Sequence, residues 1–129
     1  MKKIFPLLLL LFYAGCDDTT TNIDDEIIPD SNVSYSKHIQ PVFDAKCVNC
    51  HGAGTTEAGL DLTTWAGTTA DPSIVSRGEP DNSKLVWTTE YPSRAGFPQM
   101  PPTDSPYLPF TTNQLKGLKT WIAEGAINN

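Results

Sequence analysis

Apolar residues recur at helical spacing early in the chain, in the stretch YSKHIQPVFDAKC. The apolar positions of this stretch lie three, four or one residue apart, as one face of a helix requires: Tyr35, Ile39, Val42, Phe43 and Cys47. Ser34 is a suitable N-cap. Pro41 lacks a backbone N–H, so the helix should either kink at Pro41 or begin there. We expect its last turn to hold Cys47 and Cys50 on one face.

A second helical pattern lies near the end of the chain. Its apolar residues again form one stripe: Leu115, Leu118, Trp121 and Ile122. Thr111 and Gln114 have the spacing of a capping box, and Gly125 is a suitable C-terminal cap. Gly117 lies inside this pattern, where glycine costs about 1 kcal/mol relative to alanine. A close crossing with the first helix would explain it.

Two shorter patterns occupy the middle of the chain. Pro80, Asp81 and Asn82 form a helix-start signal, and Leu85 with Val86 would give that helix a buried face. Upstream, the stretch GLDLTTWAG offers alternating apolar residues that could line a pocket: Leu60, Leu62 and Trp65.

The first fifteen residues have the pattern of an export signal. Lys2 and Lys3 precede an apolar run of ten residues, 4–13, which is too short to span a bilayer as a stable helix. Ala14 and Gly15 then lead to Cys16. This ending resembles the bacterial lipobox, in which the cysteine after the cleavage site is acylated. We therefore expect residues 1–15 to be a signal peptide and Cys16 to carry lipid; an ordinary secretory signal is the alternative.

Residues 16–32 are acidic and rich in threonine, so we interpret them as the acylated cysteine with a flexible tether, and residues 33–129 as one small domain. Removing residues 1–15 removes two of the nine basic side chains and none of the fifteen acidic ones, which leaves a net charge of −8. This charge argues against nucleic acid or anionic lipid headgroups as ligands. It would suit a basic docking patch on a redox protein partner.

The most informative motif is KCVNCHG, where two thiols and an imidazole occupy five consecutive positions, Cys47 to His51. Zinc would need four ligands, and outside the motif the mature chain offers only His38 as a further imidazole. A thioredoxin-like dithiol should open a helix, whereas this pair closes one. A disulfide would leave His51 without a role. Covalent haem uses all three side chains, because the thiols add to the two vinyl groups and the imidazole binds iron. Gly52 would let the chain turn away where a Cβ would crowd the ring.

Met100 is the best candidate for the second axial ligand. It is the only methionine left once the signal is removed, and it lies in the proline-rich stretch FPQMPPTDSPYLPF. Prolines reduce the entropy lost when such a loop holds a weak thioether ligand in place. His38 precedes Cys47 by nine residues on the same helix, so we expect it to lie at the surface or at the helix start.

Five stretches follow one another along the chain: IQPVFDAKCVNCHG, GLDLTTW, EPDNSKL, MPP and LKTWIAEGA. In this order they resemble a class I cytochrome c, more narrowly the planctomycete-type cytochrome c domain of exported bacterial proteins. The resemblance runs from about residue 34 to residue 127. It implies a mostly α fold in which N- and C-terminal helices cross and loops wrap one covalently bound haem. It also implies thioethers at Cys47 and Cys50, with His51 and Met100 as axial ligands of the iron. Two features depart from the family pattern: Arg77, and the long stretch EYPSRAGFPQ before Met100.

These observations favour a mono-haem electron carrier, lipid-anchored at the cell envelope and linked to a respiratory chain or an oxidase. With both axial positions filled by protein, a substrate finds no open site on the iron, so we expect no enzymatic activity. Two alternatives stay open: a haem-based sensor or peroxidase-like enzyme with a displaceable sixth ligand, and a non-redox docking module. Among the pocket residues we single out Leu62 as a haem contact.

Overall fold

The computed structural model describes residues 22–52 and 54–129. The predicted signal peptide and the acylation site Cys16 therefore lie outside the described residues. Within the described ranges, none of the helices has the length and apolar character needed to cross a bilayer. The fold is mostly helical, with one two-stranded antiparallel sheet, β1 (His51–Gly52) paired with β2 (Thr55–Thr56).

The first helix is continuous through Pro41 but changes type before it. A π-helix, η2 (Tyr35–Ile39), leads directly into α1 (Gln40–Lys46). The Ser34 hydroxyl accepts a hydrogen bond from the Lys37 N–H, which confirms the predicted N-cap. The Gln40 N–H bonds five residues back to the Tyr35 carbonyl, so the wider turn ends just where Pro41 opens the α-helical part.

The last helix, α4 (Thr112–Ala123), begins at the predicted capping box. The Thr111 hydroxyl accepts from the Gln114 N–H at 3.1 Å, and the Gln114 side chain accepts from the Thr111 N–H at 3.0 Å. Of the predicted stripe, Leu118, Trp121 and Ile122 are buried, whereas Leu115 is only partly covered. Gly125 follows with a φ of +99°, the left-handed cap expected after the helix.

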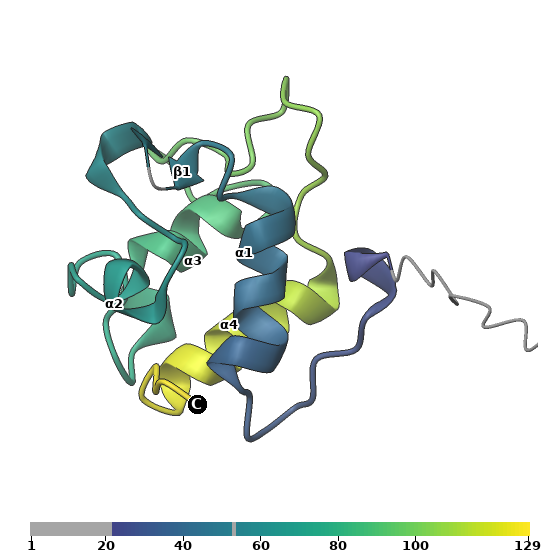
Figure 1. Ribbon diagram of the computed structural model, residues 1–129, viewed down its shortest axis with the longest axis vertical. Helices are drawn as coiled ribbons and strands as arrows, with labels where there is room; N and C mark the ends of the chain where they lie inside the picture. The colour runs from purple at the N-terminus through teal and green to yellow at the C-terminus, as the bar shows by residue number, and fades with distance from the viewer. Residues whose placement is uncertain (1–21, 53) are drawn as a thin grey trace, which may run out of the picture.

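The first and last helices pack against each other through η2 and α4, and Figure 1 shows the first helix passing across α4. Aromatic rings fill this contact. Tyr35 and Trp121 have centroids 5.2 Å apart, and Tyr35 meets Phe43 edge-on at 6.4 Å. The Tyr35 hydroxyl is bonded to Thr68, and burial raises the pKa of Tyr35 to about 12, so it stays neutral. The predicted crossing of the two terminal helices is therefore present.

Short helices lie between the terminal helices: the 3-10 helices η3 (Glu57–Gly59) and η4 (Pro80–Asn82), and the α-helices α2 (Trp65–Thr68) and α3 (Lys84–Thr89). The helix-start signal is confirmed, because η4 leads into α3, whose Leu85 and Val86 are buried. Trp65 donates through its indole N–H to the Ala126 carbonyl. Arg77 is one of the two departures from the family pattern. Its guanidinium lies 4.8 Å from the centroid of the Trp65 ring and makes a cation–π contact with it.

The predicted flexible tether is wrong for residues 22–32. Together with Val33, these residues form what we call the N-terminal strap (residues 22–33), which contains η1 (Ile23–Asp25) and packs against α4. Ile28 and Val33 are buried in the core. The Asn113 side chain bonds both backbone groups of Ile28, and the Glu124 carboxylate accepts from the backbone N–H groups of Asn32 and Val33. The domain therefore includes at least residues 22–129.

The strap is also held by a buried lysine. The Lys46 ammonium forms an ion pair with Asp24 at 2.7 Å and donates to the carbonyls of Leu108 and Pro109. Its side chain is only 4% exposed, so these acceptors replace water around the charge. The hydrogen bond from Lys46 lowers the pKa of Asp24 below its usual value. Lys46 thus joins the strap and the segment before α4 to the end of α1.

The close approach at Gly117 is made by the strap and not, as predicted, by the first helix. A Cβ at residue 117 would lie 2.5 Å from Cγ2 of Ile28 and 3.0 Å from its Cβ. Side-chain carbons do not approach this closely, so Gly117 is the residue that allows Ile28 to reach the core.

This contact makes a substitution at Gly117 testable. In an exposed helix interior, Gly117→Ala would stabilise by about 1 kcal/mol. Here we expect a net loss of about 1–2 kcal/mol, because the new methyl must displace Ile28. In an Ile28→Ala background the same change should be neutral or stabilising. Denaturant unfolding of the wild type, the two single variants and the double variant measures the coupling between residues 28 and 117. A gain in stability from Gly117→Ala alone would contradict the expected clash.

Candidate haem-binding site

The CVNC motif forms a hydrogen-bonded turn that follows the helix. The prediction that the last turn of the helix holds both cysteines is wrong, because α1 ends at Lys46 and Cys47 leaves the helical region with a φ of −127°. The carbonyl of Cys47 accepts from the backbone N–H groups of Cys50 at 3.1 Å and His51 at 2.9 Å. These bonds hold the two thiols and the imidazole at one end of the helix.

The imidazole of His51 is oriented by the residues that follow it. Its Nδ1 lies 3.1 Å from the Glu57 carbonyl oxygen. A carbonyl can only accept, so Nδ1 donates this hydrogen bond. The hairpin formed by β1 and β2 brings Glu57 back to the ring. The bond fixes the orientation of the imidazole and is of the kind that metal-binding histidines make through the nitrogen that does not bind the metal.

Gly52 is required by the packing of the chain itself, and the predicted crowding by the haem ring stays a prediction. A Cβ at this position would collide with the backbone carbonyl oxygen of Val48 and lie 3.0 Å from its Cγ1. The absent side chain therefore lets the hairpin pass close to the CVNC turn. Crowding by the turn itself explains the glycine in this structure.

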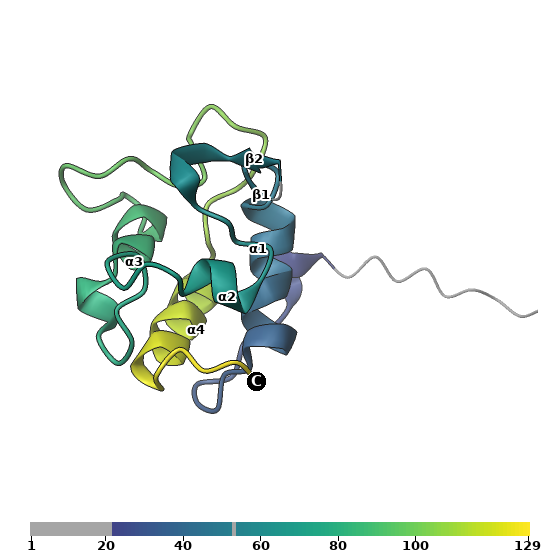
Figure 2. The ribbon, with the colours of Figure 1, turned by 60° about the vertical axis from the view of Figure 1, so that its left-hand side comes forward.

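Four of the five side chains that sequence analysis selected for haem binding, all except Leu62, come together around one hollow of about 60 Å³, which we call the motif hollow. It is lined by Lys46, Cys47, Cys50, His51, Glu57, Met100, Pro101, Pro102, Ser105 and Tyr107. The thiols, the imidazole and the thioether thus face a shared space, although Met100 is about fifty residues away in sequence. In Figures 1 and 2 the hairpin and the loop after α3 lie at the same end of the molecule.

A second hollow of about 170 Å³ shares His51 and Met100 with the first. Apart from them it is lined by Ala58, Leu60, Ile74, Lys84, Leu85, Thr88, Phe97 and Pro98. Most of these side chains are apolar, as the walls around a porphyrin should be. A wider groove, of about 500 Å³, runs along the outer face of α4, but its lining contains no cysteine, histidine or methionine. That groove has no group to bind iron.

Leu62 and His38 lie away from both hollows. Leu62 is buried in the core, and its N–H donates to the His51 carbonyl at 2.7 Å. Its neighbour Leu60 lines the second hollow. The haem contact predicted for Leu62 stays a prediction. His38 lies at the helix start, where its Nδ1 accepts from the Ser34 N–H.

Sequence analysis missed Phe97, Ile74 and Tyr107 as lining residues. Phe97 could have been selected because it is an aromatic residue three positions before the candidate ligand. Ile74 and Tyr107 lie in segments without regular structure, where no periodicity indicates which way a side chain points.

The donor set fits haem better than zinc or a disulfide. Cys47 and Cys50 are free thiols, and burial raises the pKa of Cys47 to about 12. A structural zinc site needs four ligands. Moreover, in residues 22–52 and 54–129 no three His, Cys, Asp or Glu side chains are grouped to hold a metal ion. Two thiols, a neutral imidazole and a thioether are the groups that attach and ligate a c-type haem.

A mostly helical domain in which a Cys-x-x-Cys-His run and a distant methionine share one hollow has the parts of a c-type cytochrome. Residues 47–104 match the sequence profile of the family described as Planctomycete cytochrome C. The matched segment begins at Cys47 and includes His51 and Met100, and it confirms the predicted resemblance. No curated protein and no solved structure matched the chain.

Proposed function

We propose that this c-type cytochrome carries single electrons through one haem, attached at Cys47 and Cys50 and ligated by His51 and Met100. The observation that supports this function is the shared lining of the motif hollow by these four side chains. When bound, the haem iron supplies a reversible one-electron couple. The residues around the haem would attach, orient and ligate it.

Each residue has a separate part in this proposal. Two thioether bonds at Cys47 and Cys50 would prevent the cofactor from dissociating. The bond from His51 Nδ1–H to the Glu57 carbonyl fixes the imidazole plane and makes Nε2 a better donor. Met100 would fill the remaining axial position. If His51 and Met100 both hold the iron, a substrate or gas would have no free site on it, which suits electron transfer rather than catalysis.

The function is tested by a reduced-minus-oxidised spectrum recorded with and without carbon monoxide. We expect a low-spin c-type spectrum in both oxidation states, unchanged by carbon monoxide at neutral pH. Ready binding of carbon monoxide by the ferrous wild type would remove Met100 from the iron. The sensor or peroxidase-like alternative would then replace the electron carrier.

We further propose that the protein is exported and anchored by lipid at Cys16, and that its partners are redox proteins with a basic docking patch. The anchor rests on the sequence Ala14-Gly15-Cys16 after the apolar run, and the docking patch on the net charge of −8 left after signal removal. Cys16→Ser should give a soluble protein that is still red. Recovery of this variant in the membrane fraction, in the same proportion as the wild type, would rule out the lipid anchor.

A further inference from the structure

The long stretch before Met100 is a closed loop. Residues 90–100 leave α3 at Glu90 and return to it, because the Met100 N–H donates to the Thr88 carbonyl at 2.8 Å. The chain thus begins and ends the loop beside the last turn of α3. The backbone of Met100 is therefore attached to a helix whose Leu85 and Val86 are buried in the core.

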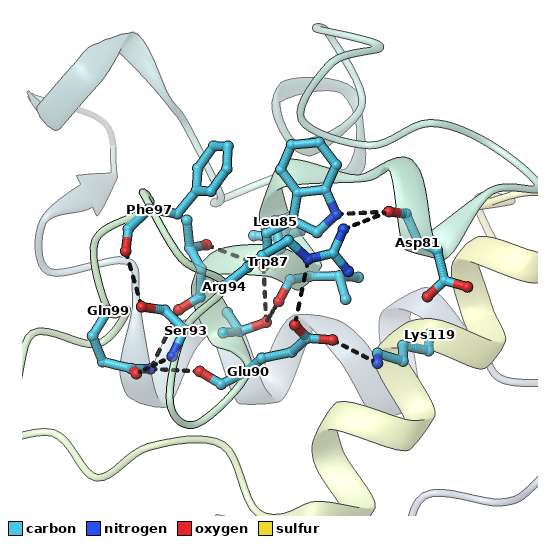
Figure 3. A network of polar contacts seen from close by, with 12 residues as sticks. Asp81, Leu85, Trp87, Glu90, Ser93, Arg94, Phe97, Gln99 and Lys119 are labelled. Carbon is cyan, nitrogen blue, oxygen red and sulfur yellow. Dashed lines mark hydrogen bonds and ion pairs between the residues drawn. The ribbon is translucent and has the colours of Figure 1, made fainter.

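A single side-chain amide closes the neck of this loop. The Nε2 of Gln99 donates to the Glu90 carbonyl at 2.9 Å, and its Oε1 accepts from the Ser93 N–H at 2.9 Å. Weaker contacts run from Nε2 to the carbonyls of Thr88 at 3.3 Å and Met100 at 3.4 Å. Figure 3 shows the Gln99 amide between the two arms of the loop. Only a group that is both donor and acceptor can make these bonds.

The opposite side of the loop is braced by stacking. The Arg94 guanidinium lies 4.8 Å from the centroid of the Trp87 ring, and Trp87 meets Phe97 edge-on at 4.8 Å. Arg94 and the Trp87 indole both donate to the backbone carbonyl of Asp81 (Figure 3). Phe97 in turn lines the second hollow beside Met100.

We propose that Gln99 is a positioning residue for Met100: its amide locks the 90–100 loop and so holds the thioether at the iron. This inference rests on the proposed His51 and Met100 ligation. Gln99 is adjacent to Met100 and fixes the loop from within, whereas the stacked Arg94 and Trp87 fix it from outside. Loosening the neck should release the sulfur more often without disturbing the core helices.

Two variants of Gln99 test different parts of this inference. Gln99→Ala removes both bonds. Gln99→Glu keeps the shape and the acceptor but, when ionised, turns a carboxylate oxygen toward the Glu90 and Thr88 carbonyls, where repulsion replaces donation. The other charges at the neck are the Glu90 carboxylate and its partners Lys119 at 2.8 Å and Arg94 at 3.8 Å.

The experiment measures carbon monoxide binding by the ferrous holoprotein. At pH 7 both variants should bind carbon monoxide, which the wild type should not, because the sulfur should be released roughly tenfold more often after the loss of one to two hydrogen bonds. The midpoint potential should fall as well. Gln99→Glu should show at least as large a defect as Gln99→Ala, because repulsion from the Glu90 and Thr88 carbonyls is added to the lost donation. Asn128→Asp is the control, because it makes the same chemical change at an exposed position.

Hydrogen exchange separates a local effect from unfolding. In both variants we expect faster exchange at the Met100 N–H while Trp121 in α4 stays protected. Equal loss of protection at both residues would show general destabilisation and overturn the positioning role. If neither the wild type nor the variants bind carbon monoxide, the positioning role would also be overturned, while the proposed function would stand. Ready binding by the wild type would instead contradict the proposed ligation itself.

Discussion

Replacing both Cys47 and Cys50 with alanine should abolish covalent haem and most of the folded state. The wild-type thiols would each form a bond to the cofactor, and alanine can form none. Cys47 also packs against the core, beside the end of α1. A domain of about a hundred residues has a stability of only about 5–10 kcal/mol. If haem occupies the two hollows, its loss should therefore unfold a large fraction of the molecules.

Extraction of denatured protein with acidic solvent measures the covalent bond directly. Haem should stay with the wild-type polypeptide and leave the double variant, and circular dichroism should report the loss of helix. Cys47→Ser with Cys50→Ser is the matched control, because serine keeps most of the side-chain volume but no sulfur. Full retention of haem by the serine protein, or release of haem from the denatured wild type, would contradict the thioether assignment.

Replacing Met100 with alanine should lower the midpoint potential and open the iron. A thioether favours ferrous over ferric iron, so its loss should remove a noticeable part of the roughly 0.8 V over which axial ligands tune haem. We expect Met100→Ala to bind carbon monoxide in the ferrous state and to gain weak peroxidase activity. Redox titration and ligand spectra measure both effects.

Two matched variants show whether the sulfur or the side-chain volume is responsible. Met100→Leu fills the motif hollow without sulfur, so it should bind carbon monoxide as Met100→Ala does. His38→Ala should leave the spectrum and potential unchanged, because His38 is bonded to Ser34 at the helix start. A potential unaffected by Met100→Ala would show that another group ligates the resting iron.

Local signals in the sequence predicted the elements that depend on neighbouring residues. The Thr111–Gln114 capping box, the Ser34 N-cap and the buried face of α3 all involve partners within four positions. Because the chemistry of the CVNCH run is also local, it could be interpreted from the sequence. Met100 was selected by elimination among few candidates, and the structure places it at the motif hollow, while its role as a ligand stays a prediction.

Features that depend on distant partners could not be predicted in this way. The strap has little periodicity, and its order depends on Asn113 and Glu124, more than eighty residues away. The interpretation of Leu60 and Leu62 assumed an extended strand, in which alternate residues share a face. In the structure the two side chains enter different environments, because Leu60 lines the second hollow whereas Leu62 is buried in the core.

Because the strap packs against the domain, it limits the distance between the domain and a lipid anchor at Cys16. If Cys16 is acylated, only residues 17–21 separate it from the described domain, and six peptide steps extend at most roughly 20 Å. The strap meets the domain where Asp24 pairs with Lys46, a residue that also lines the motif hollow. Such an anchor would keep the iron-binding end close to the bilayer surface. Electron exchange would then take place with partners in or on the same membrane, by lateral encounter rather than by free diffusion through the surrounding compartment.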